Sequence, residues 1–344
     1  MNWIDLRSDT VSHPTPSMRA AMAAAEVGDD VYKEDPTIIR LEALAAEKMG
    51  KEAGLFVPSG TMGNLAAILT HCGRGDEVIL GHRAHTFLYE AGGISALGGV
   101  HSCQLRNQPD GTLDLDEIRE AIRYDDEHEP VTRLITLENT HNRCGGVPLT
   151  VEYTEAVGEL ARSRGLSLHL DGARIFNAAA ALGVPASALA GPADSVTFCL
   201  SKGLCAPAGS VLCGSGEFIA RARRIRKQLG GGMRQVGVLA AAGIVALEEI
   251  LPCLPEDHAR ARRLANGLSR LPGIVLDSGP YTNMVFISLA ADVPLDGESV
   301  VAALEKRGVK VGQVSSRGFR LVTHYWISDE AVDQTINAFA AVLS

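Results

Sequence analysis

Apolar positions along the first 250 residues fall into two alternating kinds of segment. Longer segments with apolar residues every three or four positions predict helices over 36–50, 61–72 and 151–164. Between them stand short, almost wholly apolar runs of the kind that forms buried parallel strands. These runs cover 77–80, 131–139, 166–171, 195–201 and 209–214, and a similar run at 54–60 ends in turn residues. The pattern predicts an α/β fold, with a mainly parallel sheet covered by helices.

The last part of the chain has a different pattern. A long apolar helix is predicted over 235–251. After it we expect helices at 256–271, 297–307 and from about 328, and apolar strand-like runs at 283–289 and 319–326, which together suit an α+β domain. Because 344 residues exceed what one ordinary core holds, we predict two domains. Residues 1–252 form a large domain with an N-terminal arm, and residues 253–344 form a small α+β domain.

Composition and charge narrow the class of protein. Apolar residues make up 46% and charged residues 21% of the chain, and the net charge is −9. An acidic chain is a poor general binder of nucleic acid or anionic membranes, so we expect neither as a partner. The densest basic cluster, at 221–228, is interpreted as a solvated or intersubunit helix face.

The cysteines and the N-terminus indicate a compartment. Seven cysteines without a C-x-x-C pair argue against a disulfide framework and a structural zinc site, and favour a reducing environment. The first residues, "MNWIDLRSDTVSHP", have no apolar secretory core. No uncharged apolar stretch is long enough to span a bilayer. We therefore expect a soluble, cytoplasmic protein.

Three predicted strands end in residues that suit one kind of chemistry. The run at 54–57 leads through Ser59, Gly60 and Thr61 into a helix, whose free backbone N–H groups can bind an anion or simply form a capped helix start. Asp171 ends the run at 166–171, at the sheet edge where ligands bind in open α/β folds. Alone, this carboxylate could bind a metal, cap the next helix or hold a protonated ring nitrogen.

Lys202 follows the run at 195–201, among small residues in "FCLSKGLCAPAGS". A lysine in an apolar setting is a nucleophile toward carbonyls, although it can also extend to solvent. Together, a phosphate cradle, an aspartate and a lysine are the parts that a pyridoxal 5'-phosphate site needs. In "HRAHTFLYE", either His82 or His85 is placed to stack on the cofactor ring.

Ordered motifs along nearly the whole chain resemble one enzyme family. They are "DLRSDTV", "VGDDVYKEDPT", "FVPSGTMGN", "ENTHN", "LDGARIFNA", "FCLSKGLCAP", "GGGMRQ" and "RLVTH". The sequence is similar to the low-specificity L-threonine aldolases, which belong to the β-eliminating lyase group. The resemblance implies fold type I, the aspartate-aminotransferase fold, with pyridoxal 5'-phosphate as cofactor. It also implies reversible cleavage of L-threonine, L-allo-threonine and other β-hydroxy-α-amino acids to glycine and an aldehyde such as acetaldehyde.

The resemblance also implies roles for residues. Lys202 matches the lysine that binds the cofactor through a Schiff base, Asp171 the partner of the pyridine nitrogen, and His85 the stacking histidine. The expected phosphate contacts are Gly60 and Thr61. The expected carboxylate clamp is Ser8, Arg174 and Arg320, and His141 is expected near the substrate hydroxyl. The cofactor is also expected to contact Arg174, Lys227 and Arg234, and the substrate to contact Tyr32. Because Tyr32, Lys227 and Arg234 match positions near subunit boundaries, the resemblance implies a homotetramer with shared active sites.

Several alternatives stay open at this stage. The proton acceptor is His85 or His141, directly or through water. Arg317 competes with Arg320 for the carboxylate, and the following "RLVTH" favours Arg320. Transamination, racemisation or β-elimination on the same fold is the first rival function. A non-catalytic binding protein is the second, and a metal enzyme is the weakest, since no metal-ligand spacing is visible.

Overall fold

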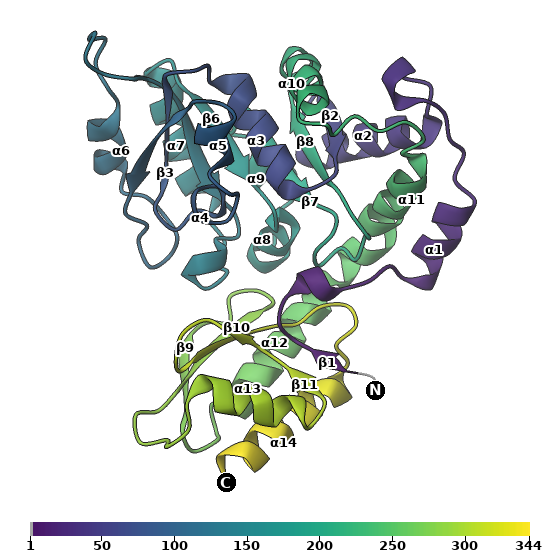
Figure 1. Ribbon diagram of the computed structural model, residues 1–344, viewed down its shortest axis with the longest axis vertical. Coiled ribbons are helices and arrows are strands. Elements are labelled where there is room, and N and C mark those ends of the chain that lie inside the picture. Colours follow the sequence, from purple (N-terminus) through teal and green to yellow (C-terminus); the bar gives the residue numbers. More distant parts are fainter. Residues whose placement is uncertain (1–2) are drawn as a thin grey trace.

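The computed structural model describes residues 3–344 and is built around a seven-stranded sheet (Figure 1). The strand order is β2-β8-β7-β6-β5-β3-β4. The strands are β2 (Ala53–Val57), β3 (Asp76–Gly81), β4 (His101–Leu105), β5 (Val131–Glu138), β6 (Ser167–Asp171), β7 (Ser195–Cys199) and β8 (Ser210–Gly214). Their positions confirm the strands predicted from apolar runs, and β4 is an addition that its polar sequence did not indicate.

One strand runs against the prediction of parallel pairing. β8 is antiparallel to both of its neighbours, β2 and β7. Its five residues are all buried, so its apolar run resembles that of a parallel strand. The connection from Cys199 to Ser210 is too short to hold the crossover helix that a parallel pair requires. The sheet is therefore mainly parallel, as expected, with this one exception.

Helices cover both faces of the large sheet. α2 (Pro36–Met49), α7 (Val151–Ser163), α8 (Ile175–Leu182) and α11 (Gly237–Val245) bury their apolar residues against one face. α3 (Gly60–His71) and α10 (Gly216–Gln228) pack on the other face. Strand residues alternate accordingly, since Phe56 faces the first layer while Leu55 and Val57 face the second. The predicted α/β architecture is confirmed.

The remaining elements around this sheet are short. They are η1 (Asp9–Val11), α1 (Pro16–Ala23), η2 (Asp30–Tyr32), α4 (His85–Leu88), α5 (Gly93–Ala96), α6 (Leu115–Ala121), η3 (Asn142–Cys144) and α9 (Ala186–Ala190). Of these, α4 and η3 follow the carboxyl ends of β3 and β5. Figure 1 shows α4 and α8 facing the C-terminal part of the chain.

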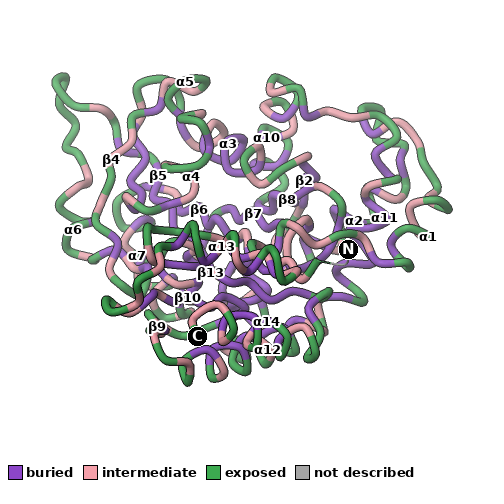
Figure 2. The backbone as a smooth tube through the Cα atoms, turned by 60° about the horizontal axis from the view of Figure 1, so that its bottom comes forward, coloured by how far each residue is buried: buried purple, intermediate pink, exposed green. Residues whose placement is uncertain are grey.

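The C-terminal part has its own antiparallel sheet and its own core. The strand order is β12-β13-β10-β9, formed by β9 (Ile274–Ser278), β10 (Met284–Leu289), β12 (Gly312–Gln313) and β13 (Gly318–Val322). The helices are α12 (Leu254–Leu268), α13 (Gly297–Glu305) and α14 (Asp329–Leu343). Their buried residues form a separate apolar cluster, purple at the bottom of the molecule in Figure 2.

The first described residues and a long helix connect the two sheets. β1 (Ile4–Asp5) pairs in parallel with β11 (Val309–Lys310), and Leu6 lies in the C-terminal core. The predicted boundary between residues 252 and 253 falls at η5 (Leu251–Cys253), within the helical run from α11 through η4 (Ala246–Ile250) into α12. The arm thus contacts the C-terminal part, which no local pattern indicated. The division at residue 252 stays a prediction.

The same helical run bears on the expected absence of a membrane span. Residues 237–268 are long and apolar enough, by length and composition alone, to cross a bilayer. However, 56% of the most apolar stretch is buried inside the fold, where Ala240 and Ala242 lie in the main core. This burial favours a core helix.

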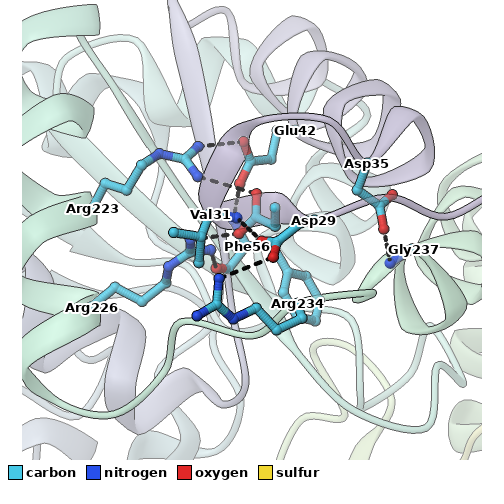
Figure 3. A network of polar contacts seen from close by, with 10 residues as sticks. Asp29, Val31, Asp35, Glu42, Phe56, Arg223, Arg226, Arg234 and Gly237 are labelled. Carbon is cyan, nitrogen blue, oxygen red and sulfur yellow. Dashed lines mark hydrogen bonds and ion pairs between the residues drawn. The ribbon is translucent and has the colours of Figure 1, made fainter.

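Figure 3 shows that two arginines of the basic cluster at 221–228 point inward. Arg226 donates to the Phe56 carbonyl at 2.8 Å and to Asp30 at 2.6 Å. Arg223 bonds Glu42 at 2.6 Å and lies 3.3 Å from Asp30. The interpretation of the whole cluster as a solvated or intersubunit face is therefore wrong for these two. These two arginines hold the segment that leads into α2. Their inward orientation depends on acidic partners that are distant in sequence, so the local sequence does not indicate it.

Candidate active site

The carboxyl ends of five strands bring the candidate residues to one edge of the large sheet. β2 leads to Gly60, β3 to His85, β5 to His141, β6 ends at Asp171, and β7 leads to Lys202. Because these strands run in the same direction, their ends share one edge. The topology therefore gathers groups that are far apart in sequence.

The start of α3 has the features of an anion site. Ser59 caps the helix by accepting from the Met62 amide at 3.2 Å, and the amides of Gly60 and Thr61 precede the intrahelical hydrogen bonds. A Cβ on Gly60 would lie 2.9 Å from Cys199 Sγ, so only glycine fits. Beside this turn, the buried hydroxyl of Ser210 has no partner within residues 3–344. A phosphate group fits this donor set.

Asp171 is buried close to His85, and no cationic side chain forms a hydrogen bond with its carboxylate among the described residues. Its Oδ2 accepts from Asn64 at 2.8 Å and its Oδ1 from the Ala173 amide at 3.1 Å. Burial raises the pKa of Asp171, and the nearby carboxylate of Glu138 raises it further. A buried carboxylate in this state is stabilised by a cation brought to it. The protonated ring nitrogen of pyridoxal phosphate is such a cation, so Asp171 fits the cofactor.

His85 is held by two carboxylates. Its backbone amide donates to Glu138 at 2.8 Å, and its Nδ1 lies 2.9 Å from Glu90 Oε1. The hydrogen bond to Glu90 raises the pKa of His85 above its ordinary value, in spite of partial burial. His82, the other candidate, instead accepts the Asn107 amide at Nδ1. Of the two histidines, His85 is the one that lines the pocket described next.

A pocket of about 380 Å³ opens above these groups. Its lining includes Ser8, His85, Arg174, Lys202 and Arg320 of the predicted set. The other lining residues are Thr10, Tyr89, Asn142, Arg143, Gly312, Gln313 and Val314. Residues from the N-terminal segment, the large sheet and the C-terminal part thus meet in one cavity. A pocket of about 700 Å³ between α2 and α10 is larger, but none of the candidate residues lines it.

Two arginines of the predicted set add to the positive charge that Arg143 and Lys202 also give the pocket. Arg174 is buried and donates through Nε and Nη2 to the two oxygens of Asp9, at 2.7 and 2.6 Å. Arg320 donates to Asn142 at 2.8 Å and to the Arg7 carbonyl at 3.1 Å. Burial lowers the pKa of Arg320, and the like charge of Arg174 lowers it further. Two neighbouring cations with one counter-ion suit a substrate carboxylate.

Arg317 lies differently, which gives a direct test of the choice between the two arginines. Its guanidinium donates to backbone carbonyls, including those of Leu289, Leu295 and Val293.

We expect Arg320→Ala to raise KM for the amino acid by roughly 10- to 100-fold through loss of a charged hydrogen bond. Arg317→Ala should lower thermal stability and leave KM nearly unchanged. Steady-state kinetics and melting curves of both variants measure these effects. A raised KM in Arg317→Ala with an unchanged KM in Arg320→Ala would show that Arg317 binds the carboxylate.

Seven predicted residues lie outside the pocket lining, and three of them, Gly60, Thr61 and Asp171, belong to the helix start and strand end described above. His141 is buried, neither ring nitrogen has a hydrogen-bond partner among the described residues, and Nε2 lies 4.0 Å from Glu138. Tyr32 is 72% exposed, Arg234 bonds Asp29 on the surface, and Lys227 is exposed near the end of α10. Within one chain, the structure does not bring Tyr32, Lys227 and Arg234 to the pocket. Their assignment to shared sites stays a prediction.

Three residues of the site were missed by sequence reasoning. Asp9 holds Arg174, Asn64 bonds Asp171, and Glu90 bonds His85. Asp9 and Asn64 stand inside the motifs "DLRSDTV" and "FVPSGTMGN", which was the available signal. By distance alone, His85, Glu90 and Asp171 could also hold a metal ion, since their ligand atoms lie within 4.8 Å of one another. The expectation of no metal stays a prediction.

The fold and this site define a class of enzyme, and comparisons agree. Residues 5–292 match the beta-eliminating lyase family. The threonine aldolase structure from Leishmania major superposes with a TM-score of 0.83 at 21% identity, covering 99% of this chain and 100% of that one. The chain is thus a pyridoxal-phosphate-dependent enzyme of fold type I.

Curated relatives narrow the class. The chain is 52% identical to low-specificity L-threonine aldolase 1 of Arabidopsis thaliana over 343 residues, covering 98% of this chain and 96% of the relative. It is 46% identical to the low specificity L-threonine aldolase of Escherichia coli K12 over 345 residues, 99% of each chain. The chain belongs to the family of low-specificity L-threonine aldolases.

Proposed function

We propose that this chain cleaves L-threonine, L-allo-threonine and related β-hydroxy-α-amino acids to glycine and an aldehyde, reversibly. The observation that carries the proposal is the pocket lined by Lys202, His85 and the Arg174–Arg320 pair, with Asp171 close to His85. The close relatives named for this activity support it.

Each residue of the pocket has a distinct task in this proposal. Pyridoxal phosphate, when bound, supplies an electron sink for the pair released as the Cα–Cβ bond breaks. Lys202 would hold the cofactor covalently, Asp171 its ring nitrogen, and the start of α3, at Gly60 and Thr61, its phosphate.

The substrate carboxylate would lie between Ser8, Arg174 and Arg320. This orientation determines which bond at Cα is broken. Binding of the carboxylate at two guanidinium groups fixes rotation about the substrate N–Cα bond. The bond presented for cleavage is then Cα–Cβ and not Cα–H. The same clamp excludes amino acids without a free carboxylate. The choice of bond separates an aldolase from the transaminases and racemases of the same fold.

The proton of the substrate β-hydroxyl must pass to a base, and we assign this role to His85. It lines the pocket and its Nδ1 is bonded to Glu90, so a neutral ring accepts at Nε2. His141 is not among the residues that line the pocket, and its Nε2 lies 4.0 Å from Glu138.

We expect His85→Asn to lower kcat by about 10²- to 10⁴-fold, and His141→Asn to have a smaller effect. Kinetics in which only His141→Asn slows cleavage would reverse the assignment.

The pH profile adds a second readout for His85. The base must be unprotonated, and Glu90 raises the pKa of His85, so activity should fall as pH drops through a midpoint above 6.5. Glu90→Gln should move this acidic limb to lower pH. An unchanged limb in Glu90→Gln would show that another group controls it.

The reaction itself is tested by aldehyde release. Protein loaded with cofactor is given L-threonine and L-allo-threonine separately, and acetaldehyde is followed with a coupled dehydrogenase. Release from either establishes the aldolase, and the ratio of the rates gives its preference. Keto-acid formation from threonine without aldehyde would instead favour transamination.

The assembly and location are also proposed. A homotetramer with sites shared between subunits would bring Tyr32, Lys227 and Arg234 of one copy near the pocket of another. Their exposure and the exposed apolar side chains Val27 and Val238 support this arrangement. The seven cysteines are free, which supports a reducing, cytoplasmic compartment.

A further inference from the structure

A line of polar side chains, buried except for the partly buried His71, runs from the far end of α3 to Asp171. His71 Nε2 lies 2.8 Å from Ser195 Oγ, which lies 2.9 Å from His169 Nδ1. His169 Nε2 is 3.3 Å from Asn64 Oδ1, and Asn64 Nδ2 donates to Asp171 at 2.8 Å. The line has a simple structural origin. Asn64 and His71 are two turns apart on one face of α3, and His169 and Ser195 are paired neighbours on β6 and β7.

The hydrogen bonds in this line have only one consistent direction. Asn64 Nδ2 faces two carboxylates, Asp171 at 2.8 Å and Glu90 at 2.9 Å, so its Oδ1 must accept from His169. His169 therefore carries its proton on Nε2, and its Nδ1 accepts from the Ser195 hydroxyl. Ser195 has no second proton, so His71 donates to it from Nε2. Every donor points toward Asp171.

The surroundings keep both histidines neutral, as this direction requires. Burial lowers the pKa of His169 to about 3 and that of His71 to about 4. Each ring then has one N–H and one free nitrogen, and only the Nε2–H form matches the neighbours. His71 is further fixed by stacking on Phe218, with ring centroids 4.6 Å apart. The line is thus a preorganised set of dipoles and carries no net charge.

We propose that His71, Ser195, His169 and Asn64 form a directed hydrogen-bond line that positions Asp171 to accept from the protonated ring nitrogen of pyridoxal phosphate. The inference rests on the proposed role of Asp171. These four are positioning residues, since none lines the pocket. Asn64 holds the carboxylate directly, and His169 keeps the Asn64 amide turned with its NH₂ group toward Asp171. Without His169, the amide loses the donor that fixes its orientation.

The experiment compares the natural cofactor with an analogue that lacks the ring nitrogen. Holoenzyme is equilibrated with mixtures of pyridoxal phosphate and its 1-deaza analogue, in which carbon replaces that nitrogen. The bound fractions are measured by mass spectrometry after reduction with borohydride. A preference for the natural cofactor reports the Asp171 interaction itself, since general damage to the fold weakens both ligands alike.

Two substitutions of His169 distinguish a positioning role of this residue from a merely structural one. His169→Gln places an amide N–H near the position of Nε2 and should keep the preference. His169→Asn reaches only the position of Nδ1 and should lower the preference by about five- to tenfold, as for the loss of one hydrogen bond. Ser195→Ala provides a second variant should His169→Asn fail to fold, with a decrease in the same direction. His258→Asn is the matched control, because His258 is buried and bonded to Asn177 outside this line.

The outcomes distinguish this inference from the proposed function. Suppose that Asp171→Asn removes the preference while His169→Asn and Ser195→Ala leave it at the wild-type value. The proposal that the line positions Asp171 is then wrong, and the role of Asp171 at the ring nitrogen is supported. If wild-type protein shows no preference, both fail. Histidine-selective ¹⁵N NMR of the holoenzyme gives an independent check: His169 and His71 are expected as Nε2–H tautomers, and an Nδ1–H form of His169 would contradict the direction.

Discussion

Lys202→Ala is expected to lower aldehyde release from threonine on the order of 10⁴-fold or more, as for the loss of a covalent catalytic group. Lys202 is the one lysine that lines the pocket. Its backbone is fixed separately, since its carbonyl accepts from Ser12 Oγ at 2.7 Å and from the Cys205 amide at 2.9 Å. Removal of the side chain should therefore leave the loop in place. The measurement is the coupled acetaldehyde assay with saturating cofactor.

A matched lysine controls for the loss of charge. Lys51 is also partly buried, but its Nζ donates to the Ala193 carbonyl at 2.5 Å, in the larger pocket near α2. Lys51→Ala should keep catalysis within a few-fold of wild type. Borohydride reduction should fix the cofactor on the peptide that contains Lys202. Retention of more than a tenth of the activity in Lys202→Ala, or cofactor fixed on another lysine, would contradict the assignment.

Local sequence signals were sufficient for much of the fold. Apolar runs located β3, β5, β6 and β7, because strands buried on both faces are rich in apolar residues. Helices with one apolar face, such as α2 and α7, were equally clear. By contrast, β4 is an edge strand without a fully buried residue, and its His101 and Gln104 are exposed. The direction of β8 depends on its connection and not on its composition.

The candidate site was predictable where it consists of strand ends, and not where it depends on long-range pairs. Asp171 ends one apolar run and Lys202 follows another, so their positions at strand ends, taken together, marked them. The partner of Arg174 is 165 positions away, and Asn64 is 107 positions from Asp171. No local pattern reports such a contact. For the same reason, Arg226 was interpreted as a surface residue, although it is 4% exposed.

The pairing of Asp9 with Arg174 shows how strongly one such contact can act. Asp9 is fully buried and receives two charged hydrogen bonds from one guanidinium. Burial alone would raise the pKa of Asp9, but the charges of Arg174, Lys202 and Arg320 hold it well below its ordinary value. This single carboxylate therefore lies beside a pocket lined by four cationic side chains, those of Arg143, Arg174, Lys202 and Arg320. It also leaves Nη1 of Arg174 as the nitrogen with capacity for a substrate carboxylate.

Asp9→Asn is expected to destabilise the protein by about 3–5 kcal/mol, the usual cost of breaking a buried ion pair. The amide keeps the shape of the side chain and removes its charge, so the guanidinium of Arg174 is left without a counter-ion. Because the guanidinium also loses its fixed orientation, KM for the amino acid should rise together with the loss of stability. Denaturant unfolding and steady-state kinetics at neutral pH measure the two effects.

The dependence on pH has a definite sign. A carboxyl group whose folded pKa is depressed stabilises the protein fully above its unfolded pKa, near 3.8, and loses this contribution as pH falls through the folded value. The difference in stability between wild type and Asp9→Asn should thus be constant around neutral pH and shrink only below about pH 4. A difference that is absent at pH 7, or that shrinks between pH 6 and pH 8, would show that the charge of Asp9 does not hold Arg174 in place.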